Sequence, residues 1–86
     1  MEELEQDVDQ TSSRSNAVSG SLDTMRHSLS AQGLNLRGDI ASAEELMKVN
    51  LDKAQQAMQN HDAKNAKKYL GLAQGNLEKI EKFLGH

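Results

Sequence analysis

The sequence predicts an all-α fold, an antiparallel up-down-up three-helix bundle, and three observations lead to this prediction. The 86 residues include no proline, the residue that most strongly interrupts a helix. Apolar residues recur every three or four positions in three separate stretches, which is the period of a helix face. The connections between these stretches are short, and short connections turn successive helices antiparallel.

The first stretch carries an apolar heptad seam whose members are spaced alternately four and three residues apart: Leu4, Val8, Thr11, Ser15, Val18, Leu22, Met25 and Leu29. Such a seam packs along its length against other helices. Its first half is weak, because two hydroxyl residues occupy core positions and the surrounding Ser and Asn residues favour helix poorly. We expect a helix over 17–31, ended by Gly33. Residues 1–16 are predicted to be an acidic, polar N-terminal segment, either frayed helix or disordered.

The second and third stretches predict helices at about 36–59 and 63–84, so that residues 17–86 form the bundle. The second has a broad apolar face that suggests contact with two neighbours; its members are Leu36, Ile40, Ala43, Leu46, Met47, Val49, Leu51, Ala54, Ala57 and Met58. Asp62 is a good N-cap for the third helix, and Gly85 lies at the position of a C-cap glycine. The third seam comprises Ala66, Leu70, Ala73, Leu77, Ile80 and Leu84.

The heptads leave a second architecture open. A helical hairpin with a long first helix would show the same spacing if two chains formed a dimeric coiled coil. Heptad spacing does not choose between a packing partner in the same chain and one in another chain.

Arg37-Gly38-Asp39 is the tripeptide that many extracellular ligands present to integrins. Here it directly precedes the apolar period that begins at Ile40. Asp39 is therefore placed to cap free backbone N–H groups or to oppose the positive end of the helix dipole. We interpret the tripeptide as the start of a helix and not as an adhesion loop.

The sequence shows no pattern typical of a catalytic or metal site. The histidines at 27, 61 and 86 are far apart, whereas zinc needs three or four converging ligands. The carboxylate pairs Glu2-Glu3 and Glu44-Glu45 are predicted to lie on polar helix faces, with Glu44 supported by Lys48 four residues later. The spacing Gly71-x-x-x-Gly75 permits close helix packing, but it is equally compatible with two glycines facing water. We therefore expect no enzyme, no cofactor, no metal and no small-molecule substrate.

Charge and composition exclude other classes of partner. The net charge is −3, and the first ten residues hold five acids and no base. With two aromatic residues and no basic excess, the chain lacks the features of a nucleic-acid-binding protein. No apolar run approaches the roughly 20 residues that span a bilayer, so we expect no direct membrane insertion. The absence of cysteine fits a reducing compartment, and we expect a cytoplasmic location.

These observations predict a non-enzymatic module for protein–protein interaction or oligomerisation, whose partner is a second copy or another helical segment. The expected interaction surface is the stronger half of the first seam, Val18, Leu22, Met25 and Leu29. The alternative is a structural helical tail or spacer of a larger regulatory protein of bacterial type, with or without a membrane anchor, that has no partner of its own.

Overall fold

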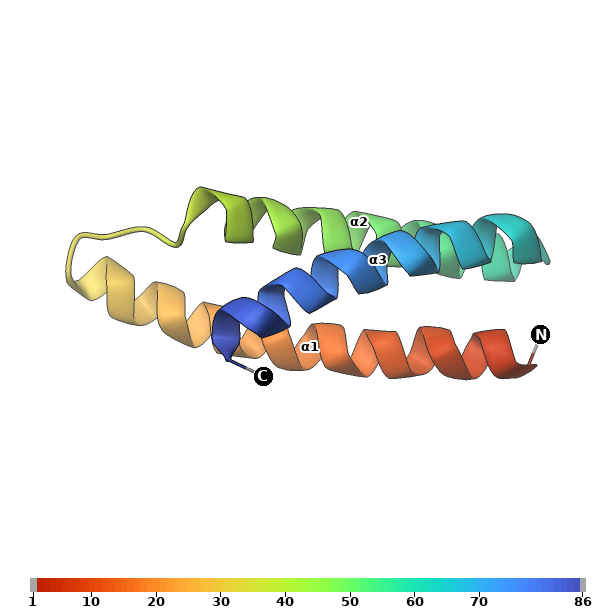
Figure 1. Cartoon of the computed structure of the whole chain (residues 1–86), viewed down its shortest axis with the longest axis horizontal. Helices are drawn as coiled ribbons and strands as arrows, with labels where there is room; N and C mark the ends of the chain where they lie inside the picture. Colours follow the sequence, from red (N-terminus) through yellow and green to blue (C-terminus); the bar gives the residue numbers. More distant parts are fainter. Residues whose placement is uncertain (1, 86) are drawn as a thin grey trace.

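The computed structural model describes residues 2–85, which form three helices: α1 (Glu2–Ala31), α2 (Gly38–Gln59) and α3 (Ala63–Leu84). They run up, down and up in a bundle that measures 46 by 18 by 17 Å (Figure 1). The predicted all-α three-helix bundle is confirmed. Met1 and His86 lie outside the described residues.

The α2–α3 hairpin is the most extensively packed pair of helices. Its turn contains His61 in the left-handed region, with φ 57°. The predicted N-cap is confirmed, because the Asp62 carboxylate accepts a hydrogen bond from the backbone N–H of Asn65 at 3.2 Å. The C-cap at Gly85 is also confirmed: its φ of 83° closes α3 in the left-handed conformation, which costs glycine little.

The connection between α1 and α2 spans residues 32–37. Gly33 takes the predicted left-handed conformation, with φ 73°, and the N–H of Leu34 donates to the carbonyl of Leu29 at 2.8 Å. The second helix begins at Gly38, two residues after the predicted start at about residue 36. The reason is the backbone of Arg37, whose ψ of 134° is extended and cannot belong to a helix.

The N-terminal segment is helical from Glu2 onward and continues into the rest of α1 without a break at residue 16. Leu4 and Val8 are buried against the hairpin, and this burial stabilises a stretch whose intrinsic helix propensity is low. That residues 1–16 fray in solution stays a prediction.

The core consists of two apolar clusters, one at each end of the bundle. The cluster nearer the N-terminus contains Leu4, Val8, Leu51, Ala54, Ala57, Ala66, Leu70 and Ala73. The other contains Val18, Leu22, Ile40, Ala43, Met47, Leu77 and Ile80. Two members of the expected broad face of α2 neither belong to a cluster nor pack against one. Leu46 is 51% exposed and Val49 is 39% exposed, because α1 and α3 cover other sides of α2.

Candidate interaction surface

The heptad seam of α1 packs against the α2–α3 hairpin of the same chain. All of its first six members are buried: Leu4, Val8, Thr11, Ser15, Val18 and Leu22. Val18 and Leu22 are 1% and 0% exposed, within the cluster that also holds Met47 and Leu77. A buried side chain of this size contributes about 1.5–3 kcal/mol. Half of the predicted surface therefore lies inside the closed bundle.

The other half, Met25 and Leu29, is only partly buried. The C-terminal end of α1 extends past both the start of α2 and the end of α3 (Figure 1). Leu84 is the last residue of α3, and beside it a hollow opens onto Met25. A partner can thus reach Met25 and Leu29 in the closed bundle, but it can reach Val18 and Leu22 only if α1 leaves the hairpin.

A polar layer separates the two apolar clusters along α1. Thr11 is 1% exposed, and its hydroxyl accepts a hydrogen bond from Nε2 of Gln74 on α3 at 3.3 Å. One residue later, the Ser12 hydroxyl accepts from Nε2 of Gln55 on α2 at 3.2 Å. Because each hydrogen bond joins one particular donor to one particular acceptor across the interface, a shift of α1 along the hairpin would break both bonds.

Two arginines connect α1 to different helices of the hairpin. Arg14 binds Glu81 of α3 through two guanidinium nitrogens, one of them Nε at 3.1 Å from Oε2. Arg26 binds Glu44 of α2 and also Asp23 of its own helix. The first pair has side-chain exposures of 46% and 20%, so solvent weakens it. The second is different, because Glu44 is buried.

Glu44 corrects the prediction that this carboxylate lies on a polar, solvated face. It is 4% exposed, and Lys48 lies 3.6 Å from its Oε2, as the spacing of four residues predicted. Burial raises the pKa of Glu44, but the hydrogen bond from Arg26, the neighbouring Ser19 hydroxyl and the charge of Lys48 lower it below its ordinary value. The side chain is therefore a buried anion at neutral pH.

Sequence spacing contained a partial signal for this pair. Glu44 comes four residues after Ile40 and three before Met47, and Arg26 comes four residues after Leu22. Residues at these distances lie on the same side of a helix. Both charged side chains were therefore placed beside core positions, but their opposition across the bundle depends on how the helices are packed.

The Arg37-Gly38-Asp39 tripeptide begins α2, as predicted. The two charged side chains bind each other, with Arg37 Nε at 2.9 Å and Nη2 at 2.6 Å from the two carboxylate oxygens of Asp39. Asp39 also lies 3.8 Å from Lys79. This mutual pairing engages both side chains that an integrin-type contact would need to hold apart.

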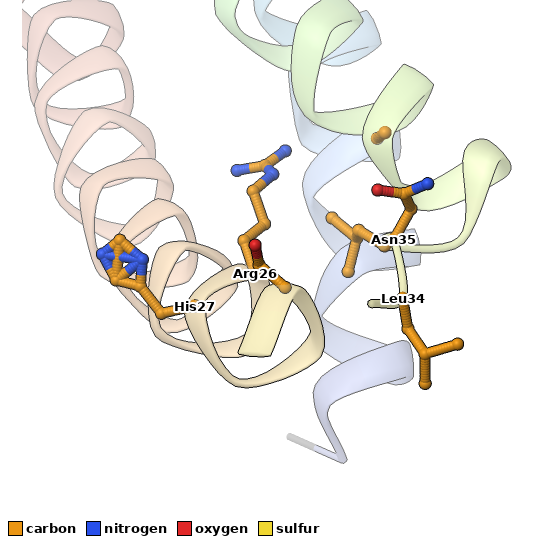
Figure 2. Close-up of a pocket in the computed structure, with 7 residues that line it drawn as sticks. Arg26, His27, Leu34 and Asn35 are labelled. Carbon is orange, nitrogen blue, oxygen red and sulfur yellow. The ribbon is translucent and has the colours of Figure 1, made fainter. Parts of the chain in front are cut away.

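A hollow of about 460 Å³ opens where α1 ends and α2 begins (Figure 2); its lining is Arg26, His27, Ser30, Leu34, Asn35, Leu36 and Ala41. Arg26 reaches from α1 toward α2, whereas the His27 ring points away from it (Figure 2). The Arg26 guanidinium is already bound to two carboxylates, which removes the strongest attraction this hollow has for an anion. Within residues 2–85, no three His, Asp or Glu side chains are grouped to hold a metal ion.

Gly71 and Gly75 face open space. A methyl group placed on either would meet no atom of the chain within 4 Å, so the close helix contact considered for this spacing does not occur within the described chain.

No family model, characterised protein or solved structure matches this chain. None of the three described helices is long and apolar enough to cross a membrane.

Proposed function

We propose that this chain is a non-enzymatic helical assembly module in which α1 is the exchangeable part. The seam of α1, including Val18, Leu22, Met25 and Leu29, binds an α2–α3 hairpin. In the closed bundle the hairpin belongs to the same chain. In the assembled form two chains exchange their first helices, and each α1 packs on the other chain's hairpin.

The observation that carries this proposal is the set of matched pairs between α1 and the hairpin. These are Thr11–Gln74, Arg14–Glu81 and Arg26–Glu44. Exchange of identical elements reproduces every such contact in the dimer, so its cost is low. The pairs fix the register, because a shifted α1 would leave Glu44 buried without its arginine.

The link between α1 and the hairpin supports the same proposal. Residues 32–37 contain no helix beyond the turn that follows α1. Six extended residues reach about 20 Å, which is longer than the width of the bundle, 17–18 Å. The link is therefore long enough to let α1 swing away from its own hairpin while the α2–α3 packing stays intact.

A charge-exchange experiment tests whether α1 moves between chains. Arg14→Glu places two carboxylates together, and Glu81→Arg places two guanidinium groups together, so each variant alone contains a repulsive pair. When the two variants are mixed, exchange restores an opposite-charge pair at both interfaces. Removal of two repulsions and gain of two attractions favours the mixed dimer by about 2 kcal/mol, roughly 30-fold in the association constant.

The expected result is that the mixture scatters light with a mass twice the 9.5 kDa of one chain at concentrations where each of the two single variants alone does not. The matched control is the double variant Arg14→Glu with Glu81→Arg, which restores the pair inside one chain and is expected to behave like the natural sequence. A mixture that stays at the single-chain mass up to about millimolar concentration, the effective concentration of a tethered helix, would refute exchange.

A structural spacer is the second candidate, and the placement of the start of α1 and the end of α3 favours it. Helix α1 begins at one end of the bundle, and α3 ends toward the other (Figure 1). Segments joined to the start of α1 and to the end of α3 would be held apart by a rod several helical turns long. A spacer with no partner of its own is expected to remain monomeric in the mixing experiment. Met25→Ser is then expected to leave its mass in solution unchanged.

A further inference from the structure

The α2–α3 hairpin presents an apolar surface on the side away from α1. Within the described helices, the exposed large hydrophobic side chains are Leu46 and Val49 of α2, at 51% and 39%, and Leu72 of α3, at 49%. We call these three residues, with Asn50, Tyr69 and Asn76 among them, the hairpin outer face.

Contacts between α2 and α3 place these residues on one side of the hairpin. Asn50 Nδ2 donates to Oδ1 of Asn76 at 3.1 Å, and the Lys53 ammonium lies 5.3 Å from the centre of the Tyr69 ring. Leu46 and Val49 precede Lys53 by seven and four residues, and Leu72 follows Tyr69 by three. These are the spacings of one helix face.

The contacts of α1 approach the hairpin from the opposite side. On α3 they are made by Gln74 and Glu81, and on α2 by Glu44 and Gln55. None of these four residues belongs to the outer face. The outer face is thus a second surface formed by α2 and α3 together, and the seam of α1 does not cover it.

The charges beside the outer face are mainly positive. Lys53 and Lys68 both lie over the Tyr69 ring, at 5.3 and 5.4 Å from its centre. Lys79 lies further along α3, where its ammonium is 3.8 Å from Asp39. The acids on this side are Glu45 and Asp39, and Asp39 is already bound by Arg37. The half of the face around Leu72 and Tyr69 is therefore flanked by lysines.

We propose that the hairpin outer face binds an amphipathic helix whose apolar stripe is flanked by aspartate and glutamate. Leu46, Val49 and Leu72 would contact the stripe, and Lys53 and Lys68 would pair with the acids. The Asn50–Asn76 pair lies between the apolar contacts with further amide donors and acceptors to offer. A polar residue opposite this pair fixes the register of the partner, as a single buried asparagine does in a coiled coil.

The Asn pair also favours a helix over a lipid surface as the occupant. Insertion of the face into hydrocarbon would take two side-chain amides away from water without new partners. A partner helix can supply hydrogen bonds to them. The proposal concerns a surface that the exchange of α1 neither uses nor requires.

Two synthetic peptides test the chemistry of the partner. Each has about 20 residues, enough for a helix of about 30 Å, with leucine at every third or fourth position. One carries glutamate at the flanking positions, and its twin carries lysine. Fluorescence anisotropy at low salt is expected to show binding of the acidic peptide at least about tenfold tighter than that of its twin, with the difference shrinking as salt screens the charges.

Variants of the protein locate the binding. Leu46→Ser and Leu72→Ser are expected to weaken binding of the acidic peptide about tenfold or more. The matched control is Leu34→Ser, which removes a similarly exposed leucine, 52%, from the loop after α1. If either variant on the outer face loses helical circular dichroism, Lys53→Gln combined with Lys68→Gln replaces it, since both positions are exposed. This double variant is expected to reduce the preference for the acidic peptide over its lysine twin.

Three results would overturn the proposal. The first is equal binding of the two peptides, and the second is acidic-peptide binding that Leu46→Ser and Leu72→Ser leave unchanged. The third is binding to phosphatidylserine-containing vesicles that these variants abolish while neither peptide binds, because that result assigns the face to a lipid surface. Failure of the charge-exchange experiment leaves this test unaffected, since the peptide sites and the α1 contacts lie on different sides of the hairpin.

Discussion

Arg26 of α1 and Glu44 of α2 form an ion pair that is open to water from one side only. The Glu44 side chain is 5% exposed, whereas that of Arg26 is 38% exposed. The arginine can therefore turn into solvent if its partner is lost, but the carboxylate cannot. This asymmetry decides which half of the pair is costly to remove.

Arg26→Gln is expected to lower the free energy of unfolding by about 2 kcal/mol, because it leaves a buried carboxylate with Lys48 as its nearest cation. Glu44→Gln is expected to cost less, since the freed guanidinium is partly solvated. The double variant should cost less than the sum of the two single changes. Urea unfolding of all four proteins measures this, and additivity within about 0.5 kcal/mol would contradict the interpretation of the pair.

Acid should destabilise the bundle through Glu44. Its pKa in the folded chain lies below the ordinary value of 4.5, so the folded state favours the charged form. The stabilisation is fully present above the unfolded pKa and is lost as pH falls through the lower, folded pKa. Between about pH 6 and pH 3, the urea midpoint of Glu44→Gln should fall less than that of the natural sequence.

Asp39→Asn is the control for this pH experiment. The hydrogen bond from Arg37 lowers the pKa of Asp39 too, but both side chains are exposed, at 65% and 41%, and exposed pairs contribute little to stability. If Asp39→Asn flattened the acid response as much as Glu44→Gln does, the buried ion pair would not be its source.

Regular spacing explains why much of this fold was predictable. Of the eight α1 positions that the heptad pattern selected, the first six, from Leu4 to Leu22, are the six buried residues of that helix. The third helix has the predicted bounds, because Asp62 and Gly85 are chemically distinct start and stop signals. Local chemistry was sufficient where the determining contacts are local.

The rest depends on which helices are neighbours. Spacing assigned both Leu46 and Met47 to a broad apolar face of α2, but only the packed bundle shows that Met47 is 0% exposed and Leu46 is 51% exposed. Burial of Glu44 was missed for the same reason. Arg26, which makes that burial possible, comes from another helix 18 residues earlier in the chain.

Thr11→Val is expected to stabilise the bundle by about 0.5–1 kcal/mol. Thr11 is 1% exposed, so a methyl group in place of its hydroxyl would join the two apolar clusters. Gln74, its hydrogen-bond donor, is only partly buried and can turn its amide to water. Thermal unfolding gives the measurement. A loss of more than about 1 kcal/mol would show that the hydroxyl contributes net stability.

Backbone amides in residues 2–16 are expected to exchange hydrogen faster than those in 17–31. Fraying starts at helix ends, and Ser12, Ser13 and Asn16 favour helix poorly, so Leu4 and Val8 hold this half of α1 by tertiary contact. Leu4→Ala should increase the difference, whereas Leu34→Ala in the loop should not. Equal protection along all of α1 would show that the N-terminal half is as firmly held as the rest.

Leu22→Glu is expected to detach α1 while the α2–α3 hairpin stays folded. Leu22 is 0% exposed in the cluster shared with Met47 and Leu77, and a carboxylate there would be taken out of water among apolar side chains, a cost of several kcal/mol. The hairpin retains its own extensive packing, so its amide protection should outlast that of α1 in NMR hydrogen exchange. Ser21→Glu, one residue away on the exposed side, is the control and should leave α1 docked. Simultaneous loss of protection in all three helices would mean that the hairpin cannot stand without α1, and α1 could then not exchange between chains with the hairpin intact.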